Sequence, residues 1–194
     1  SQKQIKKFFS VNGLSVDNIF EHFKELNINK IIHLSSETVY GSGKNLRENS
    51  IKKPSHPYAI SKLIAEMIFE KKKKINNVKS GIIVIRLPVV IFKNQKFHNT
   101  LSIMCKDAKD GKKLSIFGNG KHYRKYIHEN DLCEIISLLI KYQQKKYIEI
   151  FNVQGFVANT LKIVDEIKRY KRKLKVEFVQ NNNKSFTLTS NSKK

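Results

Sequence analysis

The feature that most constrains this fold is the segment "GIIVIRLPVVIF" at residues 81–92. It is rich in β-branched residues, which pack well on the pleated surface of a sheet. Pro88 limits how far the strand can run, because proline has no N–H to donate to a neighbouring strand. The segment therefore predicts a strand that is interrupted near residue 88.

Helical and strand-like patterns alternate on both sides of this segment. Apolar residues recur at helical spacing in residues 16–26, 57–74, 99–110, 130–142 and 159–171. Strand-like patterns occupy residues 30–36, 114–118, 147–153 and 173–179. Such alternation predicts an α/β fold with a mainly parallel sheet, whereas the polar residues 180–194 are expected to fray. Ligands of open α/β sheets bind at the carboxyl ends of strands, here Ser35–Ser36 and Leu87–Pro88.

Length and composition set broad limits. The chain has 194 residues, 40% of them apolar, which suffices for one domain with a sizeable core. No run of 18 apolar residues is present, so no membrane span is predicted. Cys105 and Cys133 lack metal-site or redox-motif spacing, and we expect reduced thiols in the cytoplasm. Because the chain opens with Ser1 and not methionine, we expect a piece of a longer polypeptide.

The formal net charge of +22 has two explanations that the sequence leaves open. One is attraction to nucleic acid or to an anionic membrane surface. The other is a lysine-rich composition throughout, since only five of the 38 basic residues are arginine, the residue best suited to binding phosphate bidentately. We therefore do not expect nucleic acid or membrane binding as the main function, although a basic surface would attract a diphosphate-bearing substrate.

A tyrosine and a lysine four residues apart occur three times, as Tyr40/Lys44, Tyr58/Lys62 and Tyr142/Lys146. Glycines interrupt the first pair, and the third lies where a helix runs out into solvent. The second pair follows Pro57, which suits the first turn of a helix. An apolar stripe that starts at Ile60 points away from both side chains, so the pair lies on the second face of the helix, as in the wall of a cleft.

The chemistry of Tyr58 depends on its neighbours. A phenol titrates near pH 10, and an ammonium one helical turn away favours the phenolate, which brings acid–base chemistry into range. Ser36, at the end of the preceding strand, can hold a substrate oxygen. The alternative is that Tyr58 is a half-buried structural residue, and the residues alone leave both open.

Four segments follow one another in a characteristic order: "HLSSETVYG" (33–41), "PYAISK" (57–62), "VIRLPVVIF" (84–92) and "IFGNGKHYRKYIHENDL" (116–132). They closely resemble the NAD-dependent epimerase/dehydratase family, the extended short-chain dehydrogenase/reductases. The resemblance implies a Rossmann-like parallel sheet with flanking helices. It also implies one α/β domain over residues 1–194, in which 93–130 and 155–194 contribute substrate-binding segments.

The resemblance also implies roles for individual residues. Tyr58 would be the catalytic acid/base, Lys62 would lower its pKa, and Ser36 would hydrogen-bond the reacting oxygen. The cofactor, NAD or NADP, would contact Ser35, Tyr58, Lys62 and Pro88. The substrate, a nucleotide-sugar or similar small molecule, would contact Ser36, Thr38 and Arg124. Asp131 is expected to cap the next helix, and the full-length protein is expected to form a homodimer.

The sequence departs from the family pattern, and these departures leave two possible functions open. Glu37 and Thr38 replace the Asp-Glu pair of the sugar-nucleotide dehydratases, which argues against a full dehydratase mechanism. The 194 residues contain no G-x-x-G-x-x-G turn, so the chain alone should bind NAD poorly. The chain is therefore expected to be part of an NAD(P)-dependent epimerase or oxidoreductase that transfers a hydride, or else a non-catalytic remnant. The spacing of the six histidines predicts no metal site.

Overall fold

The computed structural model describes residues 2–23, 28–75, 81–93, 99–180 and 187–192. The helices are α1 (Gln2–Phe8), α2 (Ser15–Phe23), α3 (Pro57–Ile75), α4 (Thr100–Lys109), α5 (Glu129–Lys141) and α6 (Thr160–Tyr170), with a π-helical segment (Phe9–Leu14) and a 3-10 turn (Glu37–Tyr40). The strands are β1 (Lys30–Ser36), β2 (Gly43–Leu46), β3 (Gly81–Leu87), β4 (Val89–Ile91), β5 (Leu114–Phe117), β6 (Tyr123–His128), β7 (Ile148–Asn152), β8 (Phe156–Asn159), β9 (Val176–Val179) and β10 (Leu188–Ser190).

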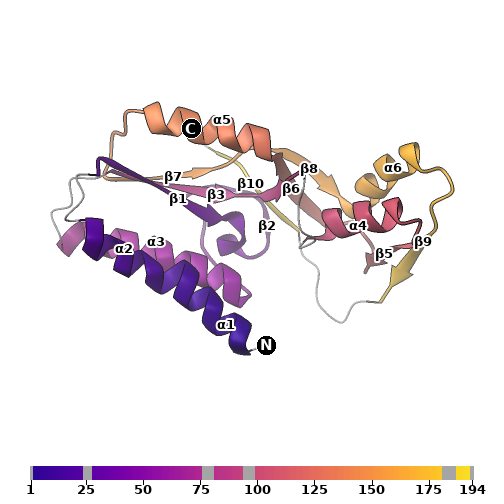
Figure 1. The fold of residues 1–194 in the computed structure, drawn as a ribbon, viewed down its shortest axis with the longest axis horizontal. Coiled ribbons are helices and arrows are strands. Elements are labelled where there is room, and N and C mark those ends of the chain that lie inside the picture. Colours follow the sequence, from indigo (N-terminus) through magenta and orange to yellow (C-terminus); the bar gives the residue numbers. More distant parts are fainter. Residues whose placement is uncertain (1, 24–27, 76–80, 94–98, 181–186, 193–194) are drawn as a thin grey trace.

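The first sheet is parallel, with strand order β1-β3-β7. Helices cover both of its faces, with α1, α2 and α3 on one side and α5 on the other (Figure 1). Ile82 and Val84 of β3 pack in a cluster with α2 and α3, whereas Ile83 and Ile85 pack in a cluster with α5. Alternate residues of a strand point to opposite faces, which explains why this strand is apolar throughout. The prediction of an α/β fold with a mainly parallel sheet is confirmed.

Pro88 lies where the chain leaves the first sheet. β3 ends at Leu87, and β4 begins at Val89 and pairs with β6 in a second sheet of order β2-β10-β6-β4, to which β8 adds antiparallel to β6. A residue without an N–H is tolerated at this change of partner. The predicted interruption at residue 88 is therefore correct.

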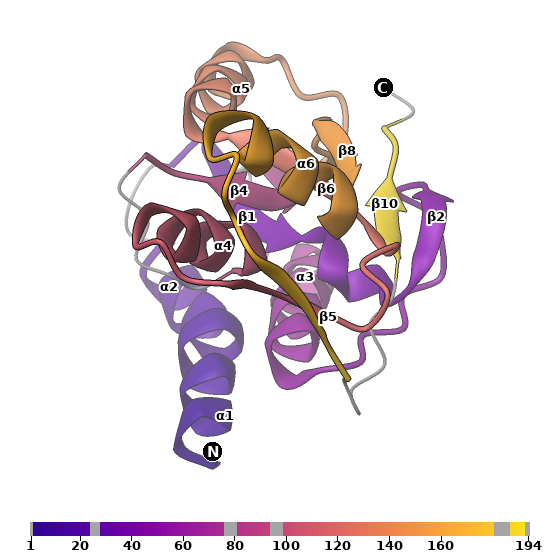
Figure 2. The ribbon, with the colours of Figure 1, turned by 90° about the vertical axis from the view of Figure 1, so that its right-hand side faces the viewer.

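The opposite end of the molecule carries the small parallel pair β5–β9 with α4 and α6 against it (Figures 1 and 2). Its core is a separate apolar cluster that includes Met104, Leu114, Ile116 and Val164. This end lies away from α1–α3 and the first sheet along the long axis of the molecule (Figure 1).

Two expectations about segment ends are wrong. Leu188–Ser190 are buried as β10 between β2 and β6, because those strands supply backbone partners that a polar sequence does not reveal. Residues 181–186 and 193–194 of the expected frayed tail lie outside the described residues. The cap of α5 is His128, whose side chain accepts a hydrogen bond from the Asn130 N–H, and Asp131 lies exposed in the first turn.

Candidate active site

The carboxyl ends of β1 and β3 meet the beginning of α3, and this junction brings Ser36, Tyr58 and Pro88 together. Two hollows share these residues as a common wall, with volumes of about 280 and 820 Å³. The smaller hollow also contacts Leu34, Ser35, Lys62, Val90 and Phe92. The larger hollow also contacts Gln4, Phe8, Glu37, Thr38, His56, Arg124 and Leu188. Because Tyr58 lines both hollows, it could contact one ligand in the smaller hollow and a second ligand in the larger hollow at the same time.

Tyr58 is largely buried, and its phenol interacts with the Ser36 hydroxyl. Burial raises the pKa of Tyr58, and the hydrogen bond with Ser36 partly offsets this effect. Ser36 also accepts hydrogen bonds from the Thr38 hydroxyl at 2.9 Å and the Thr38 N–H at 3.3 Å. The three hydroxyl groups therefore form a short chain at the edge of the larger hollow.

Lys62 lies one helical turn beyond Tyr58, as its position in the sequence predicts. Its Nζ donates to the Leu34 carbonyl at 3.0 Å and lies 5.8 Å from the centroid of the Tyr58 ring. Burial lowers the pKa of Lys62. The expected lowering of the Tyr58 pKa by Lys62 is not what the structure shows, because burial of the phenol dominates and the net direction is upward.

The remaining predicted site residues divide into two groups. Thr38, Pro88 and Arg124 line the larger hollow together with Tyr58, although Arg124 follows in the sequence by more than sixty residues. Burial lowers the pKa of Arg124, and the nearby Glu37 opposes this shift. The Ser35 hydroxyl instead donates to Glu66 Oε1 at 2.5 Å, so its proton is already engaged away from the smaller hollow.

A buried network beneath this wall joins Ser35, Tyr40, Glu66, Arg86 and Asn152, and we call it the Arg86 network. The Arg86 guanidinium is fully buried and bonds Glu66 twice, from Nε to Oε1 at 3.0 Å and from Nη2 to Oε2 at 2.6 Å. Its Nη1 donates to the Tyr40 hydroxyl at 2.7 Å. That hydroxyl donates to Asn152 Oδ1 at 2.7 Å. The network thus ties α3, which carries Tyr58, to the ends of β1, β3 and β7.

Three residues of the site were not identified from the sequence. His56 stacks on the Tyr58 ring, with centroids 6.1 Å apart, and Phe8 of α1 meets the same ring edge-on at 5.7 Å. Asn99 caps α4 by accepting from the Ser102 N–H and contacts both hollows. His56 directly precedes Pro57, and this position beside the first turn of the helix that carries Tyr58 was the signal that could have identified it as a site residue. Phe8 and Asn99 are distant in sequence and gave no such signal.

Glu37 is the carboxylic acid among the described residues that line the larger hollow. It is only 2% exposed, and burial raises its pKa to about 7 despite the opposing effects of a hydrogen bond from Ser190, of Lys125 and of Arg124. The Ser190 hydroxyl donates to Glu37 Oε2 at 3.0 Å, and the buried Lys125 ammonium donates to Ser190 Oγ at 3.1 Å. Lys125 therefore serves this buried cluster.

The metal site, the membrane span and the cysteines can be described for the residues that the structure covers. There, no three histidine, cysteine or carboxylate side chains gather in a way that could hold a metal ion. Within the same residues, no helix has the length and apolarity needed to cross a membrane. Cys105 and Cys133 are exposed free thiols.

Comparison with known proteins extends this description. A model of the NAD dependent epimerase/dehydratase family matches residues 1–153. The dTDP-D-glucose 4,6-dehydratase of Dictyostelium discoideum is 27% identical over 154 residues, which cover 73% of this chain and 35% of that protein. The N-acetyl-alpha-D-glucosaminyl-diphospho-ditrans,octacis-undecaprenol 4-epimerase of Escherichia coli O157:H7 is 26% identical over 167 residues, which cover 84% of this chain and 48% of that protein.

A solved structure agrees in fold. The UDP-glucuronic acid 4-epimerase of Bacillus cereus, in complex with NAD, has a TM-score of 0.85 and 23% identity over 93% of this chain and 58% of that chain. The two curated relatives named above are longer proteins, and this chain spans less than half the length of each. The family match covers most of its residues. The chain belongs to the NAD dependent epimerase/dehydratase family.

Proposed function

We propose that this chain supplies the catalytic half of an NAD(P)-dependent epimerase or oxidoreductase that acts on a nucleotide-sugar. The observation that carries the proposal is the placement of Tyr58, with Ser36 beside it, on a wall shared by two hollows. One hollow contains the cation of Lys62, and the other contains that of Arg124. Epimerases and dehydratases among the relatives support the reaction class.

The smaller hollow fits the nicotinamide end of the cofactor. Lys62 presents its ammonium there, suited to ribose hydroxyls, and Pro88 and Val90 present apolar surface. When bound, the dinucleotide supplies the hydride chemistry. Lys62 also holds a positive charge near Tyr58, where it would stabilise a phenolate against the effect of burial.

The larger hollow fits the nucleotide-sugar. The Arg124 guanidinium can bind a diphosphate through two parallel N–H···O bonds. Tyr58 would exchange a proton with a sugar hydroxyl, and Ser36 would hold the oxygen of that hydroxyl. With its pKa raised by burial, Tyr58 starts as a neutral phenol that can donate its proton at neutral pH.

The test is Tyr58→Phe in the holoenzyme that unites this chain with a glycine-rich dinucleotide-binding segment. Loss of the acid/base should lower turnover by about 10²- to 10⁴-fold while the cofactor stays bound. Tyr170→Phe is the matched control, because Tyr170 is exposed on the far end of the molecule. Unchanged turnover in Tyr58→Phe would remove Tyr58 from the chemistry.

A second candidate is a non-catalytic subunit or remnant of the same fold. It is favoured by the lack of a G-x-x-G-x-x-G turn among these 194 residues, since that turn supplies most of the binding to the cofactor pyrophosphate. Sequencing the DNA directly upstream distinguishes the two candidates. An in-frame glycine-rich turn supports the enzyme, and its absence supports the remnant.

A further inference from the structure

We propose that the end of the molecule formed by α4, α6 and the β5–β9 pair binds the phosphate backbone of single-stranded nucleic acid. The site is a hollow of about 810 Å³ between the turn after α4 and the segment joining α6 to β9. Its six cationic side chains define what we call the basic surface: Lys112, Lys113, Lys171, Arg172, Lys173 and Lys175. Among the residues that the structure describes, Ala108, Gly111 and Leu174 complete the lining.

Helix ends account for only part of this charge. Cations are favoured at helix C-termini, and α4 and α6 both end here. Lys171 fits that explanation, because its Nζ donates to the Lys109 carbonyl at 3.3 Å. Lys113, Lys173 and Lys175 lie outside the helices, on the approaches to β5 and β9, so a second cause is needed for them.

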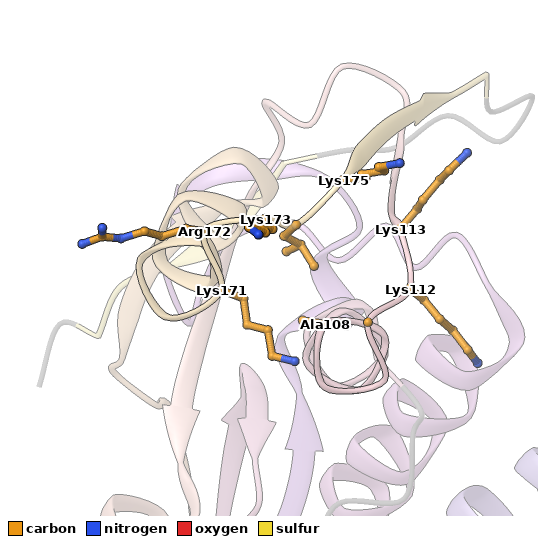
Figure 3. Close-up of a pocket in the computed structure, with 9 residues that line it drawn as sticks. Ala108, Lys112, Lys113, Lys171, Arg172, Lys173 and Lys175 are labelled. Carbon is orange, nitrogen blue, oxygen red and sulfur yellow. The ribbon is translucent and has the colours of Figure 1, made fainter.

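Two of these lysines are held beside each other. β5 and β9 pair in parallel from Leu114 and Val176 onward, and the Leu114 N–H donates to the Lys175 carbonyl at 2.9 Å. Lys113 and Lys175 extend in the same direction from this ladder (Figure 3). Like charges on neighbouring strands destabilise a sheet. A bound anion would offset that repulsion.

Carboxylates near the basic surface neutralise it only weakly. Asp110 lies 3.8 Å from Lys112, and Glu177 lies 3.8 Å from Lys113, and all four side chains are exposed. Exposed ion pairs at such distances contribute little. The hollow therefore keeps a strong positive potential that is available to an anionic ligand.

The spread of the cations favours a chain of phosphates over a compact anion. Arg172 and Lys112 point to opposite sides, and Lys171 lies between them (Figure 3). A single phosphate cannot reach side chains that diverge in this way, whereas successive phosphates of a strand can. A hollow also suits a flexible strand better than the flat surface of a bilayer. The polar side chains among the described residues that line the hollow are lysines and an arginine. Contacts from such cations to phosphates carry no sequence information, so binding should not depend on base identity.

The experiment is a titration of a fluorescent oligouridylate of about 20 nucleotides with the 194-residue chain, followed by anisotropy between about 50 and 200 mM KCl. The test variant changes Arg172, Lys173 and Lys175 to Gln, and all three side chains are exposed. Loss of three phosphate contacts, at about 0.7 each for single strands, should make the slope of log K against log[KCl] shallower by about 2.

The matched control changes Lys141, Lys145 and Lys146 to Gln. Lys141 is the last residue of α5 and the other two lysines follow it, at the other end of the long axis (Figure 1), and all three are exposed. Each variant lowers the formal charge from +22 by 3, to +19, so a general charge effect would be equal in both. Thermal melting verifies that both remain folded.

We expect the control to retain the wild-type slope and an oligoadenylate to bind as tightly as the oligouridylate. Equal weakening in both triple variants would overturn the proposal and leave lysine-rich composition as the explanation. Unchanged RNA binding in the test variant would also overturn the proposal. If the same variant then lost binding to phosphatidylserine vesicles, the basic surface would be assigned to membrane binding.

Discussion

Where α3 meets the ends of β1, β3 and β7, the guanidinium of Arg86 is fully buried, bonded twice to Glu66 and once to Tyr40. At the end of the molecule formed by α4, α6, β5 and β9, Arg172 and its neighbouring lysines extend into solvent around a hollow. The same type of cation is thus used in two physically different ways. Near Tyr58 it is desolvated and paired, whereas on the basic surface it is hydrated and surrounded by like charges.

The difference shows where charge contributes to structure in this chain. A buried ion pair has little net stabilising effect, since desolvation offsets the attraction, but breaking it leaves an uncompensated charge. The Arg86 network therefore holds strand ends and α3 in one arrangement. The cations on the basic surface do not hold strands and helices together in this way, and they are available for a ligand.

The largest expected effect tests the buried pair. Glu66→Ala leaves Arg86 buried without its carboxylate, and should lower the free energy of unfolding by about 3–5 kcal/mol. Glu166→Ala is the matched control, because Glu166 forms an exposed pair with Arg169 and its removal should cost roughly 0.5 kcal/mol or less. Urea unfolding measures both. Equal losses would show that the two kinds of ion pair do not differ as described.

A second prediction compares strands from the two regions. Leu188 of β10 is buried against Val39 and Tyr40, so Leu188→Ala should cost about 2–5 kcal/mol through lost burial and a residual cavity. Phe178→Ala on β9, where the side chain is largely exposed, should cost much less. Chemical denaturation provides the comparison. A negligible effect of Leu188→Ala would mean that residues 188–190 fray after all.

A third prediction concerns pH. The pKa of Glu37 is raised from 4.5 to about 7 by burial, so the folded chain holds a proton that the unfolded chain has already released. Its contribution to stability is complete below pH 4.5 and is lost as the pH rises through about 7. Relative to Glu37→Gln, the wild type should lose on the order of 2 kcal/mol across this range.

Unfolding free energies measured at several pH values check this prediction. Glu166→Gln serves as the control, because Glu166 is exposed and its replacement should leave the pH profile of the wild type unchanged. Parallel profiles for the wild type and Glu37→Gln would show that folding does not raise the pKa of Glu37.

The smallest expected effect lies on the basic surface. Lys175→Gln removes one of two adjacent like charges and should raise the free energy of unfolding by roughly 0.5 kcal/mol or less at low salt. The gain should vanish at high salt, where the repulsion is screened. Lys145→Gln is the control, and thermal melting at two salt concentrations is the measurement. A loss of stability in Lys175→Gln would mean that the two lysines do not repel each other.

Local patterns were sufficient for the elements with a strong period. The segment 81–92, the helix that begins at Pro57 and the strand that ends at Ser36 were all predicted close to their observed bounds. The short strands β2, β6, β8 and β10 were not, because each is polar or mixed and is stabilised by partners distant in sequence. Tyr58 and Lys62 were found because they lie on the well-predicted α3. Arg124 on β6 was implied only by the family resemblance, and Phe8 and Asn99 were missed.

The sequence by itself determined the alternation of helices and strands, the break at Pro88, and the presence of Tyr58 and Lys62 on one helix face. These features follow from periodicity and from backbone chemistry, which act between neighbouring residues. Tertiary structure alone decided that Arg124 meets Tyr58, that Ser35 turns toward Glu66, and that burial raises the pKa of Tyr58. Burial and electrostatic environment depend on which distant segments pack together, and no local pattern records that.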